Sequence, residues 1–233
     1  MTKHRNTFYS TLLGVAALAL SGSALAGPPL ICHPFVTAAD AKLLPWVPTD
    51  RNWYSPDGSY RVENLTDDTL RLLTLDAPVL SRMENLRRAT VYASQDARAA
   101  TELLHALLAR TEKPGSDPKA VALAQFDLGY LVETYRQFGH SIDYDMLKSQ
   151  RPLKPLDAFS KSASPAEAAK IASLDGQALL RQAQAALPAL NAEIEFAVSL
   201  MSPDNKTAAV HRGRASAGAP AGSLLAQNLA VFE

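Results

Sequence analysis

The stretch from Asp117 to Phe138 constrains the fold more than any other part of the sequence. An acidic residue that can cap a helix is followed by Pro118, and proline suits the first helical position because its φ is fixed and it has no N–H. Apolar residues then recur at helical spacing: Leu123, Phe126, Tyr130, Leu131, Tyr135 and Phe138. Gly139 follows, and glycine commonly lies just beyond a helix end. We predict one long helix that ends at about Phe138.

Helix-start signals recur along the chain. Thr66 is a predicted cap, Pro78 suits the first position of another helix, and Ser164 with Glu167 has the spacing of a capping box. Runs rich in Val, Ile and Thr are absent, so the β signal is poor. We predict an all-α domain over residues 65–233, with six to eight helices in antiparallel hairpins, arranged as a repeat or a bundle.

Helical spacing also predicts several less distinct elements. These are helices over 66–75, 78–92 and 95–111, a loop with one short helix over 140–163, a long helix from 165 that Pro188 breaks, a helix over 189–201, and a closing amphipathic segment from Leu224 to Phe232.

Residues 27–64 form an irregular arm rich in proline and aromatic side chains, in which only Thr37–Leu44 has the pattern of a short helix. Both tryptophans of the chain lie here, together with two tyrosines: Trp46, Trp53, Tyr54 and Tyr60. One interpretation is an ordered arm whose aromatic rings bury against the helices that follow. The other is an aromatic platform for sugars. We favour the first.

The N-terminus has the three parts of a secretory signal. Two basic residues precede the nine-residue apolar run Leu12–Leu20, and Ala24-Leu25-Ala26 fits the small-x-small rule of the processing peptidase. A membrane-spanning helix needs about 20 apolar residues, so this run is too short, and no later segment approaches that length. We therefore expect a signal peptide over 1–26, cleavage between Ala26 and Gly27, and a periplasmic or secreted product without a membrane span.

Charge and cysteine content narrow the function classes. Removing the signal leaves 21 basic and 23 acidic side chains. This near-neutral balance provides no basic face for nucleic acid and no polybasic patch for a membrane surface. Cys32 is the only cysteine, so a disulfide within one chain is impossible, and haem attachment through C-x-x-C-H is excluded. The oligomeric state stays open.

One local segment is similar to a known repeat. The stretch AQFDLGYLVETYRQFG, from Ala124 to Gly139, resembles the first helix of a tetratricopeptide repeat, with Leu128-Gly129 as its L-G pair. Gln125 stands where that repeat has tryptophan, and no second copy follows at the period of about 34 residues. The resemblance therefore implies a tetratricopeptide-like helical hairpin, and not membership of that repeat family.

Most of the mature chain resembles an uncharacterised family of exported bacterial α-helical proteins. The similar segments are GPPLICHPF (27–35), LPW (44–46), RMENLRRATVYA (82–93), GYLVETYRQ (129–137) and EIEFAVSLM (193–201). This resemblance implies export and a helical fold, and it implies no particular activity.

Two residue pairs are candidates for chemistry. Glu102 and His105 form an E-x-x-H pair, but a di-iron site in a helical bundle needs two such pairs, and no second exists. Cys32 and His33 suggest a thiol with a base or a partial zinc site, but neighbours in an extended arm point to opposite sides, and zinc needs further ligands. We favour a solvated Glu102, a half-buried His105, and a buried thiol beside a hydrogen-bonded His33.

The remaining polar pattern indicates no active site. P-loop, dinucleotide, hydrolase and zinc-protease motifs are absent from the sequence. Five arginines are interleaved with acidic residues, which is typical of a solvated helix face: Arg71, Arg82, Arg87, Arg88 and Arg98. We predict no catalytic, cofactor-binding or metal-binding residue.

The function that fits these observations is a non-catalytic exported scaffold or binding module of the cell envelope, with a protein or peptide partner. Helical hairpins commonly stack to leave a groove for such a partner. The alternative is a metal- or thiol-dependent envelope enzyme that uses Glu102 with His105, or Cys32 with His33.

The mature protein is expected to begin at Gly27, because the peptidase cuts after the small residue Ala26. Intact-mass spectrometry of exported protein measures this directly. An Ala26→Arg variant should keep its N-terminus and remain in the membrane fraction. A full-length, membrane-retained product from the unaltered sequence would contradict the prediction.

Overall fold

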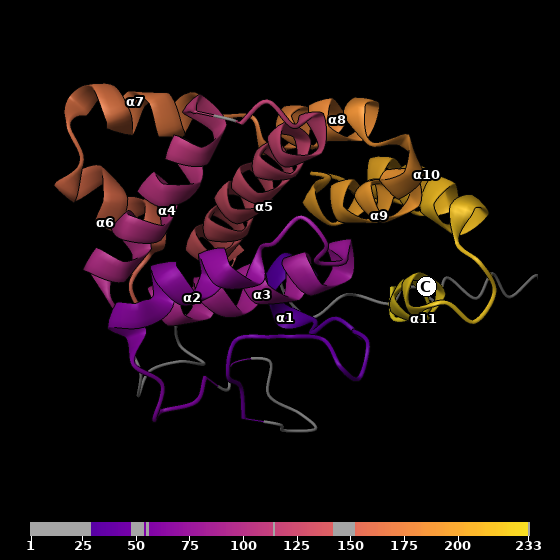
Figure 1. Ribbon diagram of the computed structural model, residues 1–233, viewed down its shortest axis with the longest axis horizontal. Coiled ribbons are helices and arrows are strands. Elements are labelled where there is room, and N and C mark those ends of the chain that lie inside the picture. The colour runs from indigo at the N-terminus through magenta and orange to yellow at the C-terminus, as the bar shows by residue number, and fades with distance from the viewer. Residues whose placement is uncertain (1–28, 48–53, 55, 114, 142–151, 233) are drawn as a thin grey trace, which may run out of the picture.

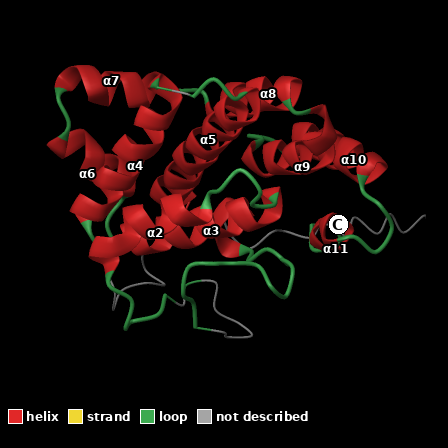
Figure 2. Cartoon of the chain, in the orientation of Figure 1, coloured by secondary structure: helices red, strands yellow, loops and turns green. Residues whose placement is uncertain are grey.

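The structure is a computed structural model that describes residues 29–47, 54, 56–113, 115–141 and 152–232. Throughout those ranges the chain is all-α and contains no strand, which confirms the predicted fold class (Figure 2). It has eleven α-helices there, more than the six to eight predicted. They are α1 (Pro29–Cys32), α2 (Leu65–Leu72), α3 (Val79–Ala93), α4 (Ala97–Glu112), α5 (Pro118–Ser141), α6 (Pro155–Ser162), α7 (Pro165–Ser173), α8 (Gly176–Ala186), α9 (Asn191–Met201), α10 (Asn205–Gly218) and α11 (Leu224–Leu229), with 3₁₀ turns η1 (Val62–Asn64) and η2 (Pro188–Leu190).

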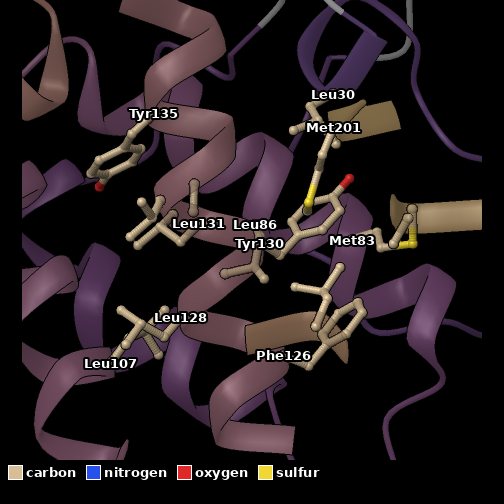
Figure 3. Packing of buried hydrophobic residues seen from close by; sticks show 14 of the residues in the cluster. Leu30, Met83, Leu86, Leu107, Phe126, Leu128, Tyr130, Leu131, Tyr135 and Met201 are labelled. Carbon is tan, nitrogen blue, oxygen red and sulfur yellow. The ribbon is translucent and has the colours of Figure 1, made fainter. Parts of the chain in front are cut away.

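Helices α3 and α5 form the centre of the molecule (Figure 1). Fourteen of the 15 residues of α3 are buried, and α5 packs against α3, α4 and α8. The core between them is shown in Figure 3, where Leu86 of α3 lies beside Tyr130 and Leu131 of α5. A helix buried on all sides is expected only at the centre of a domain. None of the described helices is long and apolar enough to cross a membrane.

Helices α4 and α5 are consecutive and antiparallel. At one end, the Tyr135 hydroxyl donates a hydrogen bond to the carbonyl oxygen of Ala100 over 3.3 Å. At the other end, Arg110 donates to the carboxylate of Asp127 over 3.3 Å. The two contacts join the start of one helix to the end of the other, which is possible only if the helices run in opposite directions.

Helices α5 and α8 approach more closely than ordinary side chains allow. A Cβ atom on Gly129 would lie 2.7 Å from the carbonyl oxygen of Gly176 and 2.9 Å from the Cβ of Leu179, so only glycine fits without a shift. Gly129 is the glycine of the predicted L-G pair. Its partner helix α8 follows α5 only after α6 and α7.

Several predicted boundaries are wrong for local reasons. Residues Thr37–Leu44 contain a turn closed by the Ala41 N–H and the Ala38 carbonyl oxygen, not a helix. Helix α2 starts before Thr66, because η1 leads directly into it. Helix α5 continues through Gly139 to Ser141, two residues beyond the glycine that was expected to follow its end.

The helix predicted from residue 165 is divided into α7 and α8. The capping box of Ser164 and Glu167 begins α7 as predicted, but Asp175 accepts a hydrogen bond from the Ala178 N–H and begins a new helix 13 residues before Pro188. Helix α8 then ends just before Pro188, as predicted. Helix α10 was not predicted, and α11 forms within the predicted closing segment. One short helix, α6, occurs within 140–163, as expected, although residues 142–151 lie outside the described ranges.

The N-terminal arm lies along α3. The backbone N–H of Phe35 donates to Glu84 and that of Leu44 donates to Asn85, so buried side chains of α3 hold the arm at two points. Tyr54 is buried, and the rings of Tyr60 and Trp46 pack against Tyr92. This confirms that these aromatic side chains bury against the helices. Trp53 lies outside the described residues.

Replacing Gly129 by alanine should destabilise the fold by about 1–3 kcal/mol, because the new methyl group must push α8 away from α5. Gly139→Ala is the matched control, since it lies in the same helix with open space around it. That change should be neutral or stabilising by up to about 1 kcal/mol. Urea denaturation measures both. Equal effects of the two substitutions would contradict the close helix contact.

Candidate functional site

The charged residues of α3 are not a solvated face. Arg82 and Arg87 are 0% exposed and Arg88 is half-buried, so the prediction was wrong for these three. Arg71 and Arg98 are exposed, as expected. Acidic side chains pair with these three arginines inside the core. A sequence in which basic and acidic residues alternate looks the same whether those charges are buried in pairs or exposed to solvent.

Glu84 is the centre of one buried charge cluster. Its carboxylate accepts two hydrogen bonds from Arg87, both of 2.8 Å, and one of 2.7 Å from Arg88. It also accepts the Phe35 N–H over 3.1 Å. Burial acts to raise the pKa of Glu84, but the attraction of Arg87 and Arg88 outweighs it, so the pKa is lowered and the carboxylate is ionised at neutral pH.

Asp127 of α5 is the centre of a second cluster. It accepts two hydrogen bonds of 2.9 and 2.8 Å from one nitrogen of Arg82, and a third, of 3.3 Å, from Arg110. Burial raises the pKa of Asp127, and the two guanidinium groups oppose that shift. Arg82 also donates to the carbonyl oxygens of Thr74 and Ala77. Both clusters hold segments of the chain together, so their hydrogen-bonding groups are already used.

Cys32 and His33 lie in different environments. Cys32 packs in a small apolar cluster with Tyr54, Val91 and Phe138, whereas the ring of His33 contacts that of Phe232, with centroids 5.1 Å apart. Burial raises the pKa of the Cys32 thiol to about 11, and burial together with the nearby Arg87 lowers the pKa of His33. The Cys32 thiol is therefore protonated at neutral pH, and the His33 imidazole is neutral.

Glu102 and His105 have separate partners. Glu102 is exposed to solvent on its side chain and accepts a hydrogen bond from Arg98 over 2.6 Å. His105 Nε2 lies 3.6 Å from a carboxylate oxygen of Glu167, and its ring packs edge-on against Phe159. Among the described residues, no group of three or more His, Cys, Asp and Glu side chains is arranged to hold a metal ion.

A third polar contact joins three helices and was not predicted. His211 of α10 lies 2.6 Å from Glu195 of α9, which also accepts a hydrogen bond from Gln184 of α8 over 2.9 Å. Since these residues lie 11 to 16 positions apart, no local motif indicates that they meet. The contact ties the C-terminal helices together.

Two adjoining hollows lie at the N-terminus of α3. A hollow of about 390 Å³ is bounded there by α3, by the start of α9 and by the α10–α11 connection, with mostly apolar walls. A second hollow of about 320 Å³ continues toward the arm and α2. Both are lined by Ala38, Pro78 and Ser81, and we call the two together the α3 groove. Figure 1 shows α9–α11 on one side of the molecule and α6 and α7 on the opposite side.

Sequence reasoning did not identify this groove as a site. The sequence singled out Arg71 as an exposed charge, Leu224 as the start of the closing segment, and Pro78 as a first helical position, and none of them as part of a site. Pro78 is found one residue earlier than expected, at the N-cap. The groove walls come from segments more than 100 positions apart along the chain, so only the packing of α9 and α11 against α3 creates it.

No family model, curated protein or solved structure matches this chain. The resemblances found in the sequence therefore stay predictions.

Cys32 should react slowly in the native protein. A pKa raised from 9.0 to about 11 lowers the thiolate fraction at pH 8 about 100-fold, and the thiolate is the reactive form. Because Cys32 is the only cysteine, the rate of alkylation by iodoacetamide reports on this residue alone. The rate should rise about 100-fold in denaturant. Equal rates in the native and denatured states would contradict the buried thiol.

Proposed function

We propose that this protein is a non-catalytic, exported binding module of the cell envelope, and that it receives a segment of a partner protein in the α3 groove. The observation that carries the proposal is the groove itself, in which a mostly apolar hollow adjoins a second hollow of mixed polar and apolar lining. Pockets that bind ligands are concave, mostly apolar, and supplied with a few polar groups that fix orientation. Export is supported by the signal-like N-terminus of the sequence.

The polar clusters support a binding role over a catalytic one. Glu84 and Asp127 are engaged by arginines of the same chain, and Cys32 has a raised pKa. An activated thiol needs the opposite shift, toward a lower pKa. A hollow of about 350 Å³ lies beside His105, with Glu112, Glu167 and Lys170 in its lining, but Glu102 is not part of it. Among the described residues, no group of three or more metal-binding side chains is arranged there, and Cys32 and His33 pack against different neighbours.

Site-specific photocrosslinking in the exporting cell tests the proposal. A photoreactive residue at Leu224, in the groove, should yield adducts with a partner protein, whereas one at Arg98, exposed on α4, should not. Filling the hollow with Ala192→Trp should abolish the Leu224 adduct, while the thermal unfolding curve shows whether that variant is folded.

Two outcomes would overturn the proposal. One is the same adduct pattern from Leu224 and Arg98, which would show that the groove is not the binding surface. The other is one metal ion per chain in tag-free protein that is lost in His105→Ala, which would favour the metal-dependent alternative. Elemental analysis of the purified protein measures the second.

A further inference from the structure

The start of α3 carries backbone donors that no side chain satisfies. The first residue of the helix is Val79, its N-cap is Pro78, and Pro78 makes no side-chain capping bond. The backbone hydrogen bonds of this helix begin with the Arg82 N–H, which donates to the Pro78 carbonyl oxygen. The N–H groups of Val79, Leu80 and Ser81 precede it and have no intrahelical acceptor. The positive end of a 15-residue helix therefore faces the groove.

Ser81 provides an independent reason to expect a ligand. It is only 4% exposed, yet it lines both hollows of the groove. Its hydroxyl has no hydrogen-bond partner among the described residues. The hydroxyl oxygen is still accessible to solvent, and because Ser81 lines both hollows, it opens into the groove. A nearly buried hydroxyl that opens into a groove and has no protein partner is available to donate a hydrogen bond to an acceptor group of a ligand.

Basic side chains surround the same end of the groove. Lys42 and Arg71 line the second hollow, and Lys42 makes no ion pair with any residue that the structure describes. A helix N-terminus, a hydroxyl and a lysine together match the chemistry of a carboxylate. The adjoining hollow is lined by apolar side chains that include Val79, Ala192 and Leu224, so it suits an apolar side chain attached to that carboxylate.

Three acidic side chains at the rim of the groove determine which kind of ligand the groove can bind. Asp40 and Asp76 line the second hollow and Glu193 lines the first, and Asp40 and Glu193 have no cationic partner among the described residues. They would repel a ligand that carries negative charge alone, such as a fatty acid. A peptide with a basic residue just before an apolar C-terminal residue satisfies both signs of charge.

We propose that the α3 groove binds the C-terminus of its partner, with the terminal carboxylate at Ser81 and the start of α3, and the last, apolar side chain in the hollow beside α9 and α11. This inference rests on the proposed binding function and specifies which part of the partner the groove takes. Each hollow has the size of a small-ligand site, about 300–1,000 Å³, so the groove takes one or two terminal residues and not a folded surface.

The test uses fluorescein-labelled Gly-Gly-Lys-Phe and the purified mature chain. Fluorescence anisotropy should show binding of the peptide with a free C-terminal carboxylate, and binding at least about tenfold weaker for the same peptide with a C-terminal amide. Ser81→Ala should weaken binding of the free acid several-fold and leave the weaker amide unchanged. Ser160→Ala, on the distant helix α6, is the matched control and should change neither. Thermal unfolding of both variants confirms that they are folded.

Four results would overturn the inference. They are no binding of the free-acid peptide up to about 1 mM, equal affinities for acid and amide, no effect of Ser81→Ala, or displacement of the peptide by decanoate at lower concentration than by unlabelled peptide, which would indicate a lipid. If any of these occurs while the Leu224 adduct still forms in cells, the binding function stands and only the C-terminal recognition fails. If the Leu224 adduct does not form in cells either, both the binding function and the C-terminal recognition are overturned.

Discussion

The rest of the molecule depends on the ion pairs and hydrogen bonds that the buried carboxylate of Glu84 makes. It joins Arg87 and Arg88 within α3 and reaches outward to the backbone of Phe35 in the arm. The guanidinium groups in turn lie over the ring of Trp46 and donate to carbonyl oxygens of the arm. An unpaired buried charge costs about 3–5 kcal/mol, so removing one member would expose the others to that cost. The arm is therefore a structural part of the core.

The groove lies beside the N-terminus of α3, which buried ion pairs and hydrogen bonds tie to its neighbours. Arg82 binds Asp127 of α5 and also the carbonyl oxygens of Thr74 and Ala77, which fixes the segment leading into α3. Helices α9 and α11 then pack beside that fixed end, with the ring of Phe232 against Phe196. A site whose walls are held in place before binding loses less entropy when a ligand arrives. In the proposed binding function, the charge clusters would act by positioning the walls of the groove, without contact with the ligand.

Local sequence signals succeeded where the chemistry is local. The carboxylate of Asp117 accepts the Lys119 N–H, and Ser164 and Glu167 form their capping box, because such bonds join residues two or three positions apart. Local sequence signals did not predict whether a charged side chain is buried with a partner or exposed to solvent. Arg82 and Arg87 have the same sequence pattern as Arg98, but the first two pair with buried acids, whereas Arg98 pairs with Glu102 at the solvent-exposed surface. The break at Asp175 was missed because the apolar spacing continues across it.

The sequence by itself determined an all-α fold, the positions of most helices and the presence of one lone thiol, because capping and helical periodicity depend on neighbouring residues. The tertiary structure decided which charges are buried, why Gly129 has no side chain, and where the α3 groove lies. These depend on contacts between distant segments: Gly129 meets Gly176 of α8, and Ser81 faces a groove whose other walls come from α9 and α11. Helix packing brings those segments together through buried area and shape, and neither has a short-range pattern in the sequence.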